Sequence, residues 1–349
     1  MALRVLRKLR FASWGVLLGG LLLCSCNQDP IFYSISLEVE PVDPRIVGMP
    51  THIVALGDRF YVASKFSRTI QWYDAEGWHE LPRPGGPIME LAATQSHIYA
   101  LTGEPGSAGL YKWDGDGDWE SIANAAHIQS IYGVEDRLFA GAMTGTSTFT
   151  MWYDNNGVLE ALSGGSGFLT GAVYDGSAYY LGGTGIYKLE ETTLTLVPET
   201  EGLTMAGLIT LGDTVVGVSG KKLLSIKSGA VTQQDLGVTF TGAMAIWGKE
   251  PKPAEKTLLL LGMQGSSTST THGYREIPLS NGSLPDAVAL SVPGRDPSNS
   301  SASDYDKYNS SLGKHPVLTL FQADDGVLFA GTTKNGLWSY RNEQWNAEP

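Results

Sequence analysis

The chain is dominated by short runs of alternating apolar and polar residues, separated by turn residues. Residues 128–162 show the unit most clearly, with runs at residues 128–132, 137–142, 149–153 and 158–162. Aromatic and β-branched residues fill the runs, whereas Gly, Asp and Asn fill the turns between them. The pattern predicts four short strands joined by tight turns.

This four-strand unit recurs along the chain at a nearly constant spacing. The central residues of the second run in five successive units are separated by 38, 40, 41 and 36 residues; they are Tyr61, Tyr99, Phe139, Tyr180 and Val216. A period near 40 residues with four strands per unit is typical of a β-propeller. One unit cannot bury both faces of its sheet, so the units must stack and close a ring. We predict an all-β fold, a β-propeller of seven four-stranded blades within residues 51–349, with six or eight blades as the alternatives.

The first run of several units is rich in Gly and Ala, as in residues 171–173, 206–208 and 242–244. Small residues suit innermost strands that crowd around a channel. The sixth unit is irregular, and it is followed by an insertion at about 293–315 that is rich in Ser, Asn and Asp. This insertion has too few apolar residues to fold by its own burial, so we expect it to be flexible or ordered by a partner.

The segment from Ile31 to Glu40 alternates apolar and polar residues and predicts one strand outside the repeats. The last unit ends close to Trp345, so its outer strand is short. The additional strand either pairs beside that outer strand and closes the ring, or crosses the outside of the ring.

The N-terminus has the pattern of a secretory signal. Four basic residues precede an apolar run at residues 11–23, which is shorter than the roughly 20 residues needed to span a bilayer. The sequence Leu23-Cys24-Ser25-Cys26 resembles the bacterial lipobox, which implies a signal peptide at residues 1–25 and lipidation of Cys26 with diacylglycerol and palmitate. Cys24 fits this pattern less well, because the bulky Leu23 would precede it. The alternative is a plain signal peptide with incidental cysteines.

Taken together, these patterns resemble the β-propeller lipoproteins of bacterial envelopes. The resemblance covers residues 31–349 at the level of pattern, and neither a WD dipeptide repeat nor an Asp-box is present. It implies a lipid anchor on a membrane leaflet, with residues 26–50 as lipidated cysteine, tether and possible closing strand. Asn27 departs from the Asp that retains lipoproteins in the inner membrane, which favours the outer membrane, at its periplasmic face or at the cell surface.

The charge of the chain excludes one class of partner. The formal net charge is −12, and removal of the four N-terminal basic residues would make it −12 − 4 = −16. Nucleic acid binding needs a basic surface, so we expect no nucleic acid partner. The turns between strands 1 and 2 and between strands 3 and 4 carry more acidic residues than the other loops, so one face of the ring should be more acidic than the other. The alternative is that Asp is simply common in tight turns. The less acidic face is the candidate docking face for a partner.

Few residues suggest metal or cofactor chemistry. The segment Asp114, Asp116, Asp118 resembles the start of a calcium loop, but Ala125 stands where an EF-hand needs its bidentate Glu, and an acidic hairpin turn is the alternative. No His-x-x-x-His spacing, Gly-x-Ser-x-Gly motif or cysteine in the repeats suggests zinc or nucleophilic chemistry. We therefore expect no cofactor.

The leading functional hypothesis is a monomeric, non-catalytic scaffold that binds another envelope protein. Candidate contact residues belong to the irregular region around the sixth unit; they are Tyr305, Tyr308, His272 and His315. A second hypothesis is a hydrolase or lyase acting on envelope glycans, which would need Glu104, Glu199, Glu201 or His272 to converge in one pocket. A third is a surface adhesin or ligand-binding lipoprotein.

Overall fold

The alternating pattern forms strands along almost the whole repeat region. The computed structural model describes residues 46, 48–74, 76–103, 108–123, 125–144, 148–249, 257–264, 273–291, 312, 315–342 and 344–348. All of them belong to the unit that runs from Asp43 to Pro349. The predicted signal peptide, Cys26 and the strand from Ile31 to Glu40 lie outside the described residues, as does most of the insertion at about 293–315.

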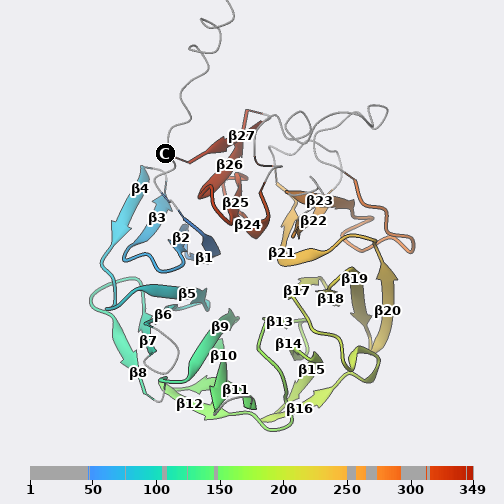
Figure 1. Cartoon of the computed structure of the whole chain (residues 1–349), viewed down its shortest axis with the longest axis horizontal. Coiled ribbons are helices and arrows are strands. Elements are labelled where there is room, and N and C mark those ends of the chain that lie inside the picture. Colours follow the sequence, from blue (N-terminus) through green and yellow to red (C-terminus); the bar gives the residue numbers. More distant parts are fainter. Residues whose placement is uncertain are drawn as a thin grey trace, which may run out of the picture. The chain divides into compact units, whose positions relative to one another are not determined.

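The strands form seven antiparallel sheets arranged as the blades of a ring around a central opening (Figure 1). The predicted seven-bladed β-propeller is therefore confirmed. In chain order the strands are β1 (Pro50–Leu56), β2 (Arg59–Ser64), β3 (Ile70–Asp74), β4 (Gly77–Leu81), β5 (Ile88–Ala93), β6 (Ile98–Thr102), β7 (Gly109–Trp113), β8 (Glu120–Ile122), β9 (Ile128–Val134), β10 (Arg137–Thr144), β11 (Thr148–Asn155), β12 (Val158–Ala161), β13 (Gly171–Tyr174), β14 (Tyr179–Gly183), β15 (Gly185–Glu190), β16 (Thr193–Leu196), β17 (Gly207–Leu211), β18 (Thr214–Ser219), β19 (Lys222–Lys227), β20 (Ala230–Asp235), β21 (Phe240–Trp247), β22 (Leu258–Met263), β23 (Tyr274–Pro278), β24 (Val317–Gln322), β25 (Leu328–Thr332), β26 (Leu337–Arg341) and β27 (Gln344–Ala347). One short 3-10 helix, η2 (Pro198–Thr200), joins the fourth and fifth blades.

The sixth blade differs from the prediction. Six sheets have four strands, but the sheet of β21, β22 and β23 has three. A fourth strand was expected at residues 287–290, yet among the described residues this edge carries just the isolated bridge between Glu276 and Ser291. The backbone of Val288 is instead held by Gln234 of β20, whose side-chain amide accepts a hydrogen bond from Val288 N (3.1 Å) and donates one to Val288 O (2.9 Å). Val288 is thus bonded to the fifth blade while Ser291 bridges to the sixth, and residues 287–290 form no fourth strand.

The hydrophobic core lies between neighbouring blades. Leu101 of the second blade and Leu138 of the third are both buried and belong to one cluster. Burying a side chain of this size stabilises the fold by roughly 1.5–3 kcal/mol, so each pair of facing sheets contributes to holding the ring together.

Small residues let the innermost strands approach one another, as the sequence predicts. A Cβ atom added to Gly133 of β9 would lie 1.9 Å from the carbonyl oxygen of Ala93 in β5. A Cβ added to Gly207 of β17 would lie 2.3 Å from the carbonyl oxygen of Gly242 in β21. Backbone meets backbone at these points, so no side chain fits there.

The ring closes where the last blade meets the first, and we refer to this boundary as the seam. Strands β1 to β4 form one sheet and β24 to β27 form another, so the described residues share no strand across the seam. Other contacts hold it: the rings of Phe60 and Phe329 are 4.6 Å apart, and Trp78 Nε1 donates to the Glu348 carboxylate at 2.8 Å. Two backbone hydrogen bonds also cross the seam, because the N–H groups of Gly336 and Leu337 donate to the carbonyl oxygens of Gly48 and Ile46, both at 3.3 Å. Among the described residues, no helix is both long and apolar enough to cross a bilayer.

Candidate functional site

A pocket of about 740 Å³ opens at the seam, and we refer to it as the seam pocket. Its walls come from the β1–β2 turn (Gly57, Asp58), the β3–β4 turn (Asp74, Glu76) and the β24–β25 turn (residues 323–325). These three turns lie on the same face of the ring, which carries the turns between strands 1 and 2 and between strands 3 and 4 of each blade. We call it the hairpin face. The pocket therefore lies on the face that the sequence predicts to be the more acidic.

Aromatic side chains form the floor of the seam pocket. Phe60 of β2 is buried, and its ring lies 5.1 Å from that of Tyr73 in β3 and 5.6 Å from that of Phe321 in β24. Phe329 supports Phe60 from the core at 4.6 Å. Because these rings are packed against one another across the seam, the floor is apolar and fixed in shape.

Carboxylates surround this floor. Asp58, Glu76, Asp324 and Asp325 are exposed at the rim, and Asp74 is partly buried. Desolvation raises the pKa of Asp74, but hydrogen bonds from His79 Nε2 (3.0 Å) and from the backbone N–H of Glu76 (2.9 Å) outweigh it and leave the pKa lowered. Asp74 is therefore ionised at neutral pH.

Arg59 is a basic residue that lines the pocket. Its guanidinium lies 4.4 Å from the ring centre of Trp72, which holds the charge against an aromatic face. Five carboxylates outnumber the two positive charges at the pocket, those of Arg59 and of Lys249 beside Asp324, so the pocket is negatively charged.

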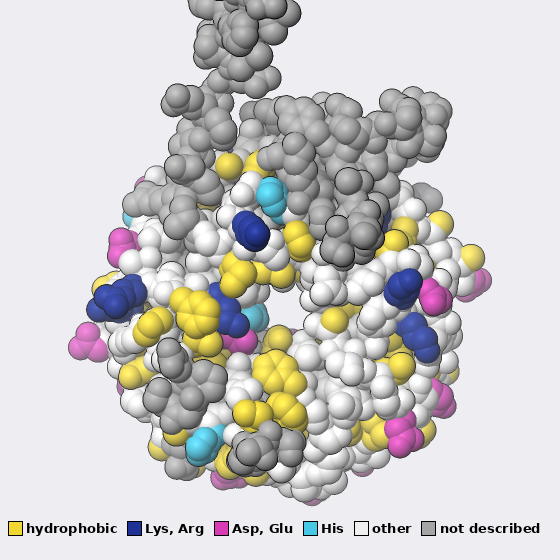
Figure 2. Space-filling view, viewed as in Figure 1, with side chains coloured by type: hydrophobic (Ala, Val, Ile, Leu, Met, Phe, Trp, Pro, Cys, Tyr) yellow, Lys and Arg dark blue, Asp and Glu magenta, His cyan; other side chains and the backbone are white. Residues whose placement is uncertain are grey.

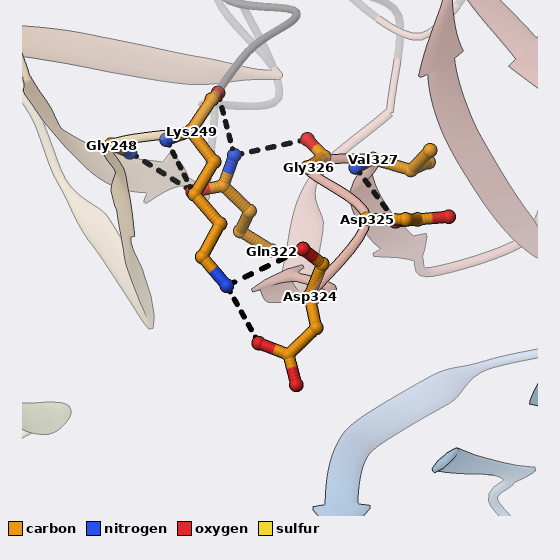
Figure 3. Close-up of polar contacts among 7 residues, drawn as sticks. All are labelled: Gly248, Lys249, Gln322, Asp324, Asp325, Gly326 and Val327. Carbon is orange, nitrogen blue, oxygen red and sulfur yellow. Dashed lines mark hydrogen bonds and ion pairs between the residues drawn. The ribbon is translucent and has the colours of Figure 1, made fainter. Parts of the chain in front are cut away.

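A turn of the sixth blade holds the acidic β24–β25 turn in place (Figure 3). Gln322 Oε1 accepts hydrogen bonds from the N–H groups of Gly248 (2.9 Å) and Lys249 (3.1 Å). Gln322 Nε2 donates to the carbonyl oxygens of Lys249 and Gly326, both at 2.9 Å. The ammonium of Lys249 pairs with Asp324 Oδ1 at 2.6 Å. The side-chain amide of Gln322 thus makes four hydrogen bonds that fix the position of the pocket wall.

The seam pocket is suited to binding rather than to acid–base catalysis. A glycoside hydrolase needs one carboxyl group that stays protonated in a desolvated site, beside a second that is ionised. The carboxyl groups at the rim of the seam pocket are exposed, and Asp74 is ionised. A positively charged group with an apolar stem would match both the carboxylate rim and the aromatic floor.

The residues proposed from sequence lie elsewhere. Tyr305, Tyr308, His272 and Glu104 lie outside the described residues. His315 lies just before β24, where its Nε2 is 2.8 Å from Asn335 Nδ2. Glu199 belongs to η2 and Glu201 follows it; both are exposed, and neither lines the seam pocket.

The acidic segment Asp114–Asp118 lies in the turn between β7 and β8. Asp114 Oδ1 accepts a hydrogen bond from Asp116 N (3.1 Å), and Asp116 Oδ1 accepts one from Gly117 N (2.8 Å). Trp113 Nε1 donates to the carbonyl of Gly117. No three His, Cys, Asp or Glu side chains of the described segments are grouped closely enough to hold a metal ion. The carboxylates of Asp114 and Asp116 therefore serve the hairpin turn.

The sequence analysis identified the acidic turns but not the pocket. Phe60 and Phe321 are 261 residues apart (321 − 60) and meet only when the last blade packs on the first. The repeat period predicts that these blades are neighbours, but it does not show which side chains meet across the seam.

No protein-family model and no curated protein sequence matches the chain. Solved structures are similar in fold. The WD40 β-propeller domain of Doa1 is 10% identical, with a TM-score of 0.57 over 85% of this chain and 94% of that chain. Virginiamycin B lyase from Staphylococcus aureus is 11% identical, with a TM-score of 0.54 over 83% of this chain and 93% of that one. An ancestral GH74 enzyme is 14% identical, with a TM-score of 0.58 over 88% of this chain but only 47% of its own length.

The fold is a seven-bladed β-propeller. The similar structures include a WD40 domain, a lyase and a GH74 enzyme, so the same ring architecture occurs in proteins of different activities. Function has to be argued from the residues of this chain.

Proposed function

We propose that this protein is a lipid-anchored, non-catalytic β-propeller of a bacterial envelope that binds a partner protein through a basic segment. The observation that carries the proposal is the seam pocket, which combines a rigid aromatic floor with a carboxylate rim. A Lys or Arg side chain of the partner would place its charge among Asp58, Asp74 and Asp325, and its methylene stem on Phe60 and Tyr73. The N-terminal lipobox-like sequence supports the anchor.

This proposal places the partner on the hairpin face, whereas the charge pattern of the sequence favours the opposite face. We prefer the hairpin face because its acidic turns form a pocket of fixed shape at the seam. Binding to a rigid pocket orders fewer protein groups, and so loses less conformational entropy, than binding to exposed loops.

Neutralising the pocket rim should weaken the binding of a basic peptide. For the double variant Asp58→Asn/Asp325→Asn, we expect the dissociation constant for a labelled tetralysine peptide to rise about fivefold. Each of two exposed ion pairs contributes roughly 0.2–1 kcal/mol to the binding free energy, and a change of 1.4 kcal/mol alters the dissociation constant by a factor of about ten. Fluorescence anisotropy at low ionic strength measures the change.

The matched control is Asp118→Asn/Glu191→Gln, which removes the same two charges from hairpin turns of other blades. Both residues are exposed and lie outside the seam pocket. If the control weakens tetralysine binding as much as the pocket variant does, the peptide responds to the net charge of the ring, and the seam pocket is not the binding site. Adding Phe321→Ala to the pocket variant tests the contribution of the floor.

The anchor is tested separately through Cys26. We expect wild-type protein produced in a diderm bacterium to incorporate labelled palmitate and to fractionate with membranes, and Cys26→Ala to lose both properties. Cys24→Ala is the control, because the lipobox resemblance assigns the lipid to the second cysteine. Loss of palmitate in Cys24→Ala but not in Cys26→Ala would move the modification site, and loss in neither would exclude a lipoprotein.

A further inference from the structure

The face of the ring opposite the hairpin face carries the loops between strands 2 and 3 of each blade and the connections between blades. We call it the crossover face. Between the first two blades it presents Phe66, in the β2–β3 loop, which at 57% is the most exposed large hydrophobic side chain of the described residues. In Figure 2 hydrophobic side chains and a basic one gather beside the central opening over these blades, and most acidic side chains lie nearer the outer edge.

The backbone holds Phe66 in a strained conformation. Its φ angle is 65°, in the left-handed region, where a bulky residue is rare and costs energy. The corresponding loops of the second and fifth blades have glycine in this region, at Gly103 and Gly220. Phe66 N donates to the carbonyl oxygen of Ile88 at 2.7 Å, and Ile88 N donates to that of Ser67 at 2.8 Å. The loop is thus bonded to the start of β5 and fixes an aromatic ring in solvent, without the burial that normally stabilises such a ring.

Basic residues lie on both segments that meet at this contact. The ammonium nitrogen of Lys65 is 5.7 Å from the centre of the Phe66 ring. Arg68 follows in the same loop and Arg83 lies in the connection from β4 to β5, and both are exposed. Residues 65–69 and 82–87 contain these three basic residues and no acidic one, although the formal net charge of the chain is −12. We refer to Lys65, Phe66, Arg68 and Arg83 as the entry patch.

The chain enters the ring beside the entry patch. The carbonyl oxygen of Met49, directly before β1, accepts a hydrogen bond from Lys65 N at 2.8 Å. The carbonyl oxygen of Gly48 accepts one at 3.3 Å from Gly336 N, in the β25–β26 loop, which is also on the crossover face. A lipid on Cys26, upstream of these residues, would therefore hold the ring by its crossover face.

We propose that the entry patch rests on an anionic lipid leaflet, with the Phe66 ring in the interface and Lys65, Arg68 and Arg83 at headgroup phosphates. The choice of a leaflet as the occupant rests on the proposed lipid anchor. Anionic headgroups attract basic residues close to a membrane, and aromatic rings are favoured at the membrane–water interface. In this orientation the seam pocket, on the hairpin face, is directed away from the leaflet and can be reached by a partner.

A fluorophore at position 66 tests the proposal. The chain has two cysteines, one in the signal peptide and one lipidated, so Phe66→Cys and Asp118→Cys each add a single free thiol to the anchored protein. The first thiol is on the crossover face and the second is in a turn of the hairpin face. Both variants are labelled with nitrobenzoxadiazole and reconstituted in two-to-one phosphatidylcholine–phosphatidylglycerol vesicles, with and without doxyl-labelled lipid. We expect the doxyl lipid to quench the dye at position 66 at least about threefold more than the dye at position 118.

Two pairs of substitutions test the contribution of charge. Adding Lys65→Gln/Arg68→Gln to the chain labelled at position 66 should reduce the quenching by about half, because attraction to the headgroups is lost. Vesicles of phosphatidylcholine alone should have the same effect on the unsubstituted patch. The matched control Lys188→Gln/Lys227→Gln removes two exposed positive charges outside the entry patch and should leave the quenching unchanged.

Incorporation of labelled palmitate is measured on the same samples, which separates the anchor from the patch. Palmitate together with equal quenching at the two positions, or equal losses in the two charge variants, would overturn the proposal and leave the anchor intact. If palmitate is absent, Cys24→Ser/Cys26→Ser chains with the same dyes are added to the vesicles from outside, and equal quenching again overturns the proposal. A blue shift at position 66 that needs no vesicles and grows with protein concentration would assign the patch to a second copy of the chain, and would also overturn it.

Discussion

Replacing Gly133 by alanine should disrupt the packing between the second and third blades and destabilise the protein by about 3 kcal/mol or more. The added Cβ would lie 1.9 Å from the carbonyl oxygen and 2.3 Å from the carbonyl carbon of Ala93. Both are backbone atoms of the innermost strand β5, so no side-chain rotation relieves the overlap, and β9 has to move away from its neighbour. Overpacking a core usually costs 1–3 kcal/mol, and a clash between two backbones lies at or above the upper end.

Urea unfolding followed by tryptophan fluorescence measures this effect, since the chain contains nine Trp. Gly248→Ala is the matched control: its φ is outside the left-handed region, and its Cβ would meet only Thr257 side-chain atoms at 3.6 Å or more. We expect the control to change stability by less than about 0.5 kcal/mol. A Gly133→Ala variant as stable as the control would show that the innermost strands are not in close contact at this position.

The architecture of the ring could be predicted from sequence because it depends on local signals that repeat. The spacing of residues such as Tyr61, Tyr99 and Phe139 follows from one blade per period, and the Gly-rich first strands follow from crowding at the centre. Each of these signals is contained in about 40 residues. The same local reasoning was wrong about the fourth strand of the sixth blade, because Gln234 of the neighbouring blade takes the backbone hydrogen bonds of Val288.

The sites were harder to predict, for two different reasons. The seam pocket depends on contacts between residues as far apart as Phe60 and Phe321, which the repeat does not specify. The residues near the start of the innermost strands, in contrast, left a local signal: His52 and Glu90 are 38 residues apart (90 − 52), the same spacing as Tyr61 and Tyr99 (99 − 61). A charged residue in an innermost strand, in phase with a histidine in the preceding blade, marks the channel once the period is known.

Glu276 should make the protein less stable as the pH rises from about 4.5 to 8. This residue of β23 is buried, and its Oε1 atom has no hydrogen-bond partner. Burial raises the pKa of its carboxyl group from 4.5 to about 7. The folded state therefore keeps the proton over a range in which the unfolded state has lost it. The stability that this proton contributes is present below pH 4.5 and is lost as the pH rises through 7.

We expect Glu276→Gln to remove this dependence, because the amide stays neutral. A shift from 4.5 to about 7 corresponds to about 3 kcal/mol. Glu276→Gln should therefore raise the free energy of unfolding by about 2–3 kcal/mol at pH 8 and leave it nearly unchanged at pH 4.5. Urea unfolding of both proteins at several pH values between these limits measures the difference.

Two comparisons identify the cause of the effect. Glu191→Gln, at an exposed turn, should shift stability by less than about 0.5 kcal/mol at every pH, since substitutions at exposed positions change the free energy of unfolding little. Glu90→Gln should reproduce the gain at high pH, because burial raises its pKa in the same direction. His52 acts in the opposite direction: its lowered pKa contributes stability above pH 6.5 that is lost as the pH falls towards 4. A Glu276→Gln variant whose stability follows that of the wild type in parallel from pH 4.5 to 8 would show that this carboxyl group is solvated, and that the open edge of the sixth blade admits water.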